Sequence, residues 1–533
     1  MAGFKLGLIL WTVSISAWAQ TNRYIVFFRD KNNNPYSIDQ PQAFLSTKSI
    51  SRRNHSSIAV NADDLPVTPA YVSQVKATGA KVFFTTKWMN ALLIESTAST
   101  ISAISLLPMV AKTEMVAPGK KLIGGRSKLV KQKNAGNADQ VTYNQLEMLG
   151  LDTMHGNGIY GSGVMVSVLD GGFPGVNTAA PFQHIFTDGR LVMTRDYVTN
   201  SGNVYQFDKH GTEVFSVISA VLPGSFTGGA YKANYLLFVT EDVGSEYRVE
   251  EYNWLFAAEK ADSAGTDIIQ SSLGYNLFDD SQMDYKISDL DGKTAIVSKA
   301  ASMARDRGII VVLSAGNDGT DAWHYIAPPA DADGILAVGA VDATEIKANF
   351  SSYGPTSDGR IKPDVVALGV NTSVIKPDGT LGTASGTSLA APLITSLAAG
   401  LLSAYPELTP AELVHIMKLS ASKGNAPNNQ VGFGLPNYIS VRNYLQSNKA
   451  GDEIFIFPNP METSLKVAFK KLPEGQVDLT FYDSQGKLLA NPVVILDWLS
   501  NPLEISLSNL AAGSYFLKVK TSTLIKTFHF VKL

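Results

Sequence analysis

Three short segments of this 533-residue sequence place an acid, a base and a nucleophile beside glycine. Asp170 follows the apolar run Val164 to Leu169 and precedes two glycines, His210 opens a His-Gly-Thr segment, and Ser388 lies in Gly-Thr-Ser-Leu-Ala-Ala-Pro. A serine hydroxyl becomes a nucleophile when an imidazole takes its proton and a carboxylate holds that imidazole in the right tautomer. The three segments together predict nucleophilic catalysis at a carbonyl by Asp170, His210 and Ser388.

A fourth segment supplies a neutral hydrogen-bond donor. The apolar run Ile309 to Leu313 continues as Ser-Ala-Gly and ends at Asn317. A strand end holds a side-chain amide rigidly, where it can stabilise a developing negative charge. Taken singly, each of these residues has an ordinary alternative: the Asp and Asn as turn residues, the His as a surface or core residue, the Gly-Thr-Ser as a helix cap. Their conjunction favours catalysis.

Strands and helices must bring these residues together. From roughly residue 143 to 445 apolar strands alternate with helices, which is typical of an α/β fold with a parallel sheet buried on both faces. The predicted strands are 164–169, 235–239, 267–273 and 309–313, and the predicted helices are 247–264, 294–307 and 410–419. Another helix is expected from His210 through Phe215, Ile218 and Val221. Ligands bind at the carboxyl ends of parallel strands, which is where Asp170 and Asn317 fall.

The first 19 residues predict a secretory signal peptide. Lys5 precedes an apolar run from Leu6 to Ile15, and Ala-Trp-Ala at 17–19 fits a cleavage site. The alternative, a membrane anchor, needs about 20 apolar residues. The richest later segment, 393–402, is interrupted by polar residues and glycine and suits a buried helix. We therefore expect export, with no membrane span.

Two further units flank the central one. Residues 20–116 predict a small α+β unit with strands at 24–28, 81–84 and 89–94 and a helix at 71–78. Residues 117–142 are a linker that carries six basic residues between 116 and 133, either solvated or cut after export. Residues 448–533 predict a β-sandwich with strands at 464–469, 477–482, 513–519 and 526–531.

Composition excludes several classes of protein. The sequence has 44 basic and 47 acidic residues, a net charge of −3, so nothing indicates a nucleic-acid partner recognised by bulk charge. It has no cysteine, which excludes disulfide scaffolds, thiolate metal sites and cysteine nucleophiles.

The order and wording of these motifs resemble the subtilisin family (subtilases) of serine proteases. Residues 386–392 match the family's serine motif fully, 210–212 its histidine motif and 164–172 its aspartate motif. One departure is Glu213, where the family commonly has His. The resemblance extends to Gly432–Asn437, near the end of the catalytic domain. It implies a subtilisin-like fold for 143–447, catalysis by Asp170, His210 and Ser388, and an oxyanion hole made by Asn317 and the Ser388 amide.

The resemblance also implies where a peptide substrate binds. Ser272, Leu273 and Gly274 resemble the segment that pairs with an extended peptide and forms one wall of the primary pocket. Ser314, Ala315 and Gly316 would form the opposite wall, with a floor near Ala327 to Pro329. Small residues on both walls predict an open pocket for a fairly large apolar side chain.

The flanking units resemble accessory parts of exported proteases. Residues 20–116 resemble subtilase propeptides, which assist folding and inhibit the enzyme until removed. The C-terminal unit resembles sorting domains of the type IX secretion system of Bacteroidetes through the segments 457–460, 481–487, 513–519 and 526–533. The implied partners are protein or peptide substrates, the chain's own propeptide and the type IX machinery. The implied location is outside the cell, reached through the periplasm, in released or surface-attached form.

Other readings remain open at this stage. The chain could be a non-catalytic binding or adhesion protein that retains the protease fold, or a protease that processes one partner. The C-terminal unit could be an ordinary accessory sandwich. No cofactor is needed for the predicted chemistry; family members often bind structural calcium, but the sequence locates no such site.

Overall fold

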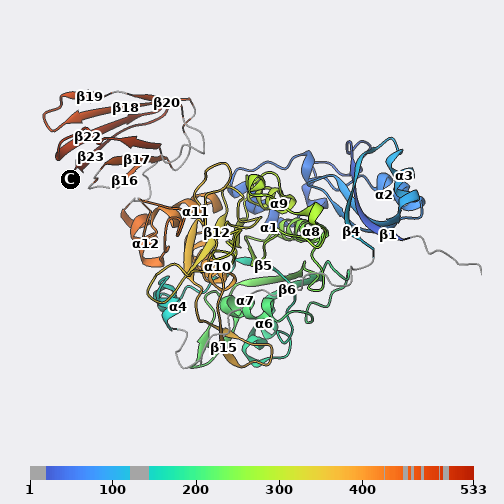
Figure 1. Ribbon diagram of the computed structural model, residues 1–533. Coiled ribbons are helices and arrows are strands. Elements are labelled where there is room, and N and C mark those ends of the chain that lie inside the picture. Colours follow the sequence, from blue (N-terminus) through green and yellow to red (C-terminus); the bar gives the residue numbers. More distant parts are fainter. Residues whose placement is uncertain are drawn as a thin grey trace, which may run out of the picture.

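The computed structural model describes residues 20–119, 143–424 and 426–447, together with 454–457, 461, 463–469, 473, 475–490, 492–495 and 503–532. The predicted signal peptide and linker residues 120–142 lie outside the described residues. We call 20–119 the N-terminal unit, 143–447 the central domain and 454–532 the C-terminal unit (Figure 1).

The N-terminal unit is an antiparallel sheet with helices, as the sequence predicts. Its strand order is β2-β3-β1-β4. The elements are β1 (Thr21–Phe28), β2 (Lys81–Thr86), β3 (Ala91–Thr97), β4 (Val110–Pro118), α1 (Thr47–His55), α2 (Pro69–Ala77) and α3 (Ala98–Ser105). The strand β4 and the helices α1 and α3 were not anticipated.

The central domain is built on a seven-stranded parallel sheet, which confirms the predicted α/β class. Its strand order is β13-β12-β11-β10-β5-β9-β6. The strands are β5 (Met165–Asp170), β6 (Leu191–Asp196), β9 (Asn234–Val239), β10 (Ile268–Ser271), β11 (Ile310–Ser314), β12 (Leu336–Val341) and β13 (Val365–Leu368). After β5 the chain runs to β6 at the sheet's edge and then to β9, and it next crosses to the other side of β5 to form β10. The β5–β10 pair is therefore the switch point at which α/β sheets bind ligands.

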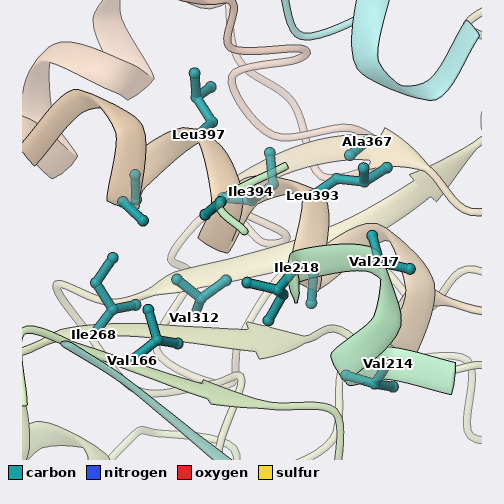
Figure 2. Close-up of a cluster of buried hydrophobic side chains, with 14 of the residues drawn as sticks. Val166, Val214, Val217, Ile218, Ile268, Val312, Ala367, Leu393, Ile394 and Leu397 are labelled. Atoms are coloured by element: carbon teal, nitrogen blue, oxygen red, sulfur yellow. The ribbon is translucent and has the colours of Figure 1, made fainter. Parts of the chain in front are cut away.

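Two helix layers cover the sheet, and side chains alternate between them. Val166 and Val168 on β5 join the core under α7 (His210–Ser219) and α10 (Thr387–Ala404), whereas Met165 and Leu169 join the core under α8 (Val249–Ala264) and α9 (Ile296–Arg305). Figure 2 shows α7 and α10 side by side above the strands, with their apolar side chains interleaved. Because strand side chains alternate, Asp170 lies on the α7–α10 face, like Val166 and Val168.

Among the described residues, α10 alone is long and apolar enough to cross a membrane by length and composition. In this structure 83% of that stretch is buried, as the sequence predicts for a buried helix.

Two predicted elements are corrected. Helix α7 ends at Ser219 instead of continuing through Val221, because Ala220 is extended (ψ 149°) and Val221 pairs in the short hairpin β7 (Val221–Leu222) and β8 (Phe226–Thr227). The strand predicted at 267–273 is β10 alone, Ile268–Ser271. It ends early because Ser272 leaves the ladder and bonds to Ser388.

The remaining elements of the central domain surround this frame. They are α4 (Tyr143–Glu147), α5 (Leu151–Gly156), α6 (Gln183–Thr187), α11 (Pro410–Leu419), α12 (Tyr438–Ser447) and the hairpin β14 (Thr372–Ile375) and β15 (Leu381–Ala384). Helix α11 begins and ends where the sequence predicts, since Thr409 and Glu412 form a capping box and Pro410 occupies the first turn.

The C-terminal unit consists of two antiparallel sheets that share one apolar core. One sheet contains β16 (Ile454–Phe457), β17 (Ser464–Phe469) and β21 (Leu503–Ser506). The other contains β18 (Gln476–Asp483), β19 (Leu488–Ala490), β20 (Val493–Ile495), β22 (Gly513–Lys520) and β23 (Ile525–Lys532). This is the predicted β-sandwich. Residues 458–460 and 533 of the predicted sorting motifs lie outside the described residues.

Candidate active site

The structure brings Asp170 and His210 into direct contact. The Nδ1 atom of His210 lies 2.9 and 3.1 Å from the two carboxylate oxygens of Asp170. Asp170 ends the central strand β5 and also accepts the Gly171 N–H at 2.7 Å, while His210 opens α7. Gly211 makes this approach possible, because a Cβ there would stand 2.2 Å from the Gly172 carbonyl oxygen and 2.9 Å from the Asp170 Cβ.

Burial and charge set the protonation of this pair. Asp170 is 1% exposed and His210 4%. Burial alone lowers the pKa of His210, but the Asp170 carboxylate, joined by Asp208 and Glu213, outweighs burial and raises that pKa to about 9. Burial likewise raises the pKa of Asp170, against the pull of His210. The Nε2 atom of His210 is buried and has no hydrogen-bond partner among the described residues. The imidazole is thus held by one nitrogen and available at the other.

Ser388 lies in the first turn of α10 and is bound to the strand next to Asp170. Its Oγ donates to the Ser272 carbonyl at 3.4 Å, and the Ser272 Oγ donates to the Ser388 carbonyl at 2.9 Å. In the parallel register Leu169 pairs with Ser271, so Asp170 and Ser272 leave adjacent strands at the same level. Neighbouring strands lie about 4.8 Å apart. The structure therefore gathers Ser388, Ser272 and Asp170 at the carboxyl ends of these two strands. The Ser388 hydroxyl points to the Ser272 carbonyl and not to His210.

Asn317 lies beside the same helix end. Its Oδ1 accepts the Thr387 N–H and the Thr387 hydroxyl, both at 2.9 Å. These two bonds direct the Nδ2 atom toward the start of α10, where it would be 3.5 Å from a Cβ on Gly386. The Asn317 amide and the Ser388 N–H in the first turn of α10 thus lie near one point, an arrangement that can bind an oxyanion.

The two predicted pocket walls lie on either side of one short segment. Gly274 is close enough to Ala327 that a Cβ would stand 3.0 Å from the Ala327 Cβ. On the other wall the Ala315 carbonyl accepts the Ala327 N–H at 3.2 Å, and a Cβ on Gly316 would be 2.9 Å from the Ser352 Oγ. Ala327 therefore contacts both walls, which is where the sequence placed the floor.

Sequence reasoning missed two residues that hold the site. Asp208 accepts the His210 backbone N–H at 2.8 Å, and Thr387 orients Asn317. Thr387 lies inside the serine motif, and Asp208 lies two residues before His210, where an Asp ahead of the first helical residue is an ordinary capping signal. Glu213, the departure noted above, forms an ion pair with Lys209 at 2.9 Å and contributes to the raised pKa of His210.

The structure also bears on metal binding. Within the part of the chain that is described, no group of three or more His, Cys, Asp or Glu residues could hold a metal ion.

Comparison with known proteins places these segments. The sequence profile of the Subtilase family matches residues 161–434. That of the peptidase S8 propeptide domain of Bacteroidota matches 23–134, and that of the secretion system C-terminal sorting domain matches 455–532.

Individual relatives cover the central domain. Serine protease AprX of Bacillus subtilis (strain 168) is 29% identical over 300 residues, 50% of this chain and 63% of that protein. Subtilisin NAT of Bacillus subtilis subsp. natto is 32% identical over 268 residues, 49% of this chain and 61% of that protein. Subtilisin of Bacillus pumilus is 31% identical over 268 residues, 49% of this chain and 84% of that protein. The matches thus span less than two thirds of the first two relatives.

Among solved structures, MycP1 from Mycobacterium smegmatis aligns with a TM-score of 0.46 at 21% identity, covering 58% of this chain and 86% of that chain.

Proposed function

Because this chain belongs to the Subtilase family, we propose that it is the precursor of a secreted serine endopeptidase that cleaves peptide bonds through an acyl-enzyme. One observation carries the proposal: the Asp170 carboxylate binds His210 Nδ1, while the opposite nitrogen, Nε2, is buried and has no hydrogen-bond partner within the described part of the chain. That is the nitrogen a serine proton must reach.

In the proposed mechanism the Ser388 hydroxyl first turns from the Ser272 carbonyl toward His210. Its Oγ attacks the scissile carbonyl carbon as its proton passes to His210 Nε2, and Asp170 stabilises the imidazolium. The new oxyanion accepts hydrogen bonds from Asn317 Nδ2 and the Ser388 N–H. When the intermediate collapses, the C–N bond breaks and the proton from Nε2 goes to the leaving amine. Water then repeats the sequence on the ester and frees Ser388.

Substrate would bind in extended form along the segment Ser272 to Gly274. We propose that its specificity-determining side chain enters between that segment and Ser314 to Gly316, above Ala327. Ser272 and Gly274 on one wall, Ser314 and Gly316 on the other, and Ala327 between them are all small. This supports a preference for a fairly large apolar side chain, which cleavage of a peptide library would measure.

The flanking units fit an exported precursor. The sorting-domain match at 455–532 indicates a secreted or cell-surface protein, and the propeptide match at 23–134 indicates a precursor. We propose that residues 1–19 direct export to the periplasm and that the type IX machinery recognises the C-terminal unit. We also propose that the N-terminal unit inhibits the central domain until the linker that joins these two is cut.

Casein cleavage by the secreted protein and by its Ser388→Ala variant tests the enzymatic proposal. The parent should cleave casein. The variant should lose activity by several orders of magnitude and should unfold at the same temperature as the parent. Ser373→Ala, a buried serine on β14, is a matched control. Equal activity in the parent and the Ser388 variant would instead favour a binding protein that retains the fold.

A further inference from the structure

The N-terminal unit packs its sheet against the apolar face of α8, and it also contacts the central domain through α1 and the turns that follow it. We call residues 46–65 the α1 arm. It lies on the ends of α8 and α9, where Gly265 and Gly308 follow in left-handed conformation. A Cβ on Gly265 would stand 2.7 Å from the Lys48 Cβ, and one on Gly308 would stand 3.2 Å from Ile58 Cδ1. The arm therefore lies directly against two helix ends.

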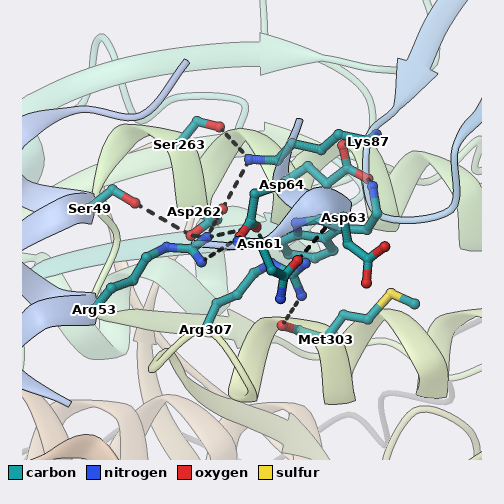
Figure 3. A network of polar contacts seen from close by, with 12 residues as sticks. Ser49, Arg53, Asn61, Asp63, Asp64, Lys87, Asp262, Ser263, Met303 and Arg307 are labelled. Atoms are coloured by element: carbon teal, nitrogen blue, oxygen red, sulfur yellow. Dashed lines mark hydrogen bonds and ion pairs between the residues drawn. The ribbon is translucent and has the colours of Figure 1, made fainter. Parts of the chain in front are cut away.

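Asp262 on α8 is the centre of the contact (Figure 3). Its carboxylate accepts from Arg52 at 2.6 Å and from Arg53 at 2.8 Å, both on α1. Lys87, which follows β2 of the N-terminal unit, donates to the same carboxylate at 3.0 Å. One carboxylate of the central domain is thus bound by three cations of the N-terminal unit.

A second acid reverses the direction of the pairing. Asp64 of the arm binds Arg53 at 3.0 Å within its own unit and Arg307 of the central domain at 2.8 Å. Arg307 also lies 4.5 Å from the centre of the Trp88 ring. Each side of the contact therefore supplies both an anion and a cation. A different protein surface docked against either side would bring like charges together or leave buried charges unpaired.

The network is as buried as a domain core. The side chains of its six charged residues are between 0 and 9% exposed; they are Arg52, Arg53, Asp64, Lys87, Asp262 and Arg307. Although burial raises the pKa of Asp262, the cations around it hold that pKa below its usual range. Burial also raises the pKa of Asp64, but Arg307 and Arg53 outweigh it and hold that pKa below its usual range, so both acids are ionised and paired.

The network lies at the amino ends of the sheet's strands, and the proposed catalytic residues lie at their carboxyl ends. Arg52 donates to the carbonyls of Thr266 and of Arg307, the latter at 3.1 Å, and these residues precede β10 and β11. Asp170 and Ser272 lie at the carboxyl ends of β5 and β10. A strand of four or five residues spans about 15 Å. The arm does not cover the catalytic edge and holds the unit from the other side.

We propose that the α1 arm is a separate anchor that sets the lifetime of the complex between the N-terminal unit and the central domain after the linker is cut. Buried, hydrogen-bonded charge pairs act chiefly on dissociation rates. Only the description of that complex as inhibited rests on the proposed function; the anchor itself does not.

Dissociation of the cleaved chain tests the proposal. A recognition sequence for a site-specific protease is inserted within residues 120–142 of the full-length Ser388→Ala chain, which cannot cut itself. After cleavage, the dissociation rate of the N-terminal fragment is measured at a fixed salt concentration. Asp262→Ala should raise this rate about 30-fold or more. Lys112→Ala, which removes an exposed ion pair of the same unit, should change it less than about twofold.

Further variants separate anchoring from misfolding. Thermal unfolding of each uncut chain shows whether it is folded. Arg53→Lys serves as the test if Asp262→Ala does not fold. It keeps the positive charge but loses the contact with both Asp262 oxygens, so the fragment should dissociate faster than from the parent. Arg53→Ala combined with Asp262→Ala should raise the dissociation rate by less than the product of the two single effects, because both changes remove the Arg53–Asp262 pair. The proposal would be overturned if the N-terminal fragment dissociated from the folded variants at the same rate as from the parent.

In chains that keep Ser388, Asp262→Ala should also shorten the lag before activity appears. An unchanged lag together with faster dissociation would count against the inhibitory role of the N-terminal unit and leave the anchor standing.

Discussion

His210 is held by charges from three directions. Asp170 binds its ring, Asp208 its backbone N–H, and Glu213 lies one helical turn further along α7. Burial opposes these charges but does not outweigh them, so the pKa of His210 is about 9. A general base must be neutral to accept a proton, so the protonated imidazole present below this pKa is inactive.

The pH profile follows from this sign. In the proposed enzyme kcat/KM should rise with pH and level off as His210 deprotonates near pH 9. Asp170→Asn removes the largest of the charges that raise the pKa of His210, so that pKa should fall and the rising limb should move to lower pH. The same change should reduce kcat about 10⁴-fold through loss of the correct tautomer. A rising limb at the same pH in both proteins would show that another group controls the profile.

Asn317 should act on turnover and not on binding. Asn317→Ala removes the amide donor and should lower kcat about 10²–10³-fold, the loss measured for such a donor in subtilisin, with KM nearly unchanged. Thr387→Val removes only the hydroxyl that positions Asn317 and should cost less. Steady-state kinetics on one peptide substrate gives both values. A raised KM at unchanged kcat would assign Asn317 to substrate binding instead.

At the scale of elements, the alternation of strands with helices could be predicted from the sequence, whereas the residues at which several of these elements end could not. Nearly continuous apolar runs indicated a sheet buried on both faces, and the helix predicted at 410–419 is α11. The end of β10 depends on the contact of Ser272 with Ser388, 116 residues away. The end of α7 likewise depends on the hairpin that follows it. Such boundaries are set by contacts distant in sequence, which local patterns do not contain.

Gly211 shows how closely α7 approaches β5. In Gly211→Ala the new Cβ would meet the Gly172 carbonyl and Asp170, so α7 must shift. We expect a loss of about 1–3 kcal/mol in the free energy of unfolding and a lower kcat. Gly156→Ala, at the end of α5 with nothing within 4 Å of the new Cβ, is the matched control. Urea unfolding that is equal for the two variants would contradict the packing described here.

At the scale of the whole molecule, composition shifts and motifs indicated three units and their order. The residues of the proposed triad could be named because each lies in a specific motif. The α1 arm could not be predicted, because its arginines pair with Asp262 more than 200 residues away and read locally as an exposed basic helix end. The positions at which export and maturation cut the chain stay predictions.

Deletion of residues 448–533 tests the role of the C-terminal unit. If that unit only directs export, the truncated protein should accumulate in the periplasm, disappear from the medium and cell surface, and still cleave casein after activation. Cell fractionation with an activity assay on each fraction measures this. Normal secretion of the truncated protein, or loss of casein cleavage in every fraction, would favour an accessory sandwich that serves substrate binding.

The relay itself is tested most directly by a fluorophosphonate probe, which reacts with activated serine hydroxyls and loses fluoride. Mass spectrometry of the labelled, matured protein identifies the modified residue. We predict that Ser388 alone is labelled, and that His210→Ala abolishes labelling while the protein remains folded. Labelling of a different serine in an active preparation, or undiminished labelling of Ser388 without His210, would contradict the account.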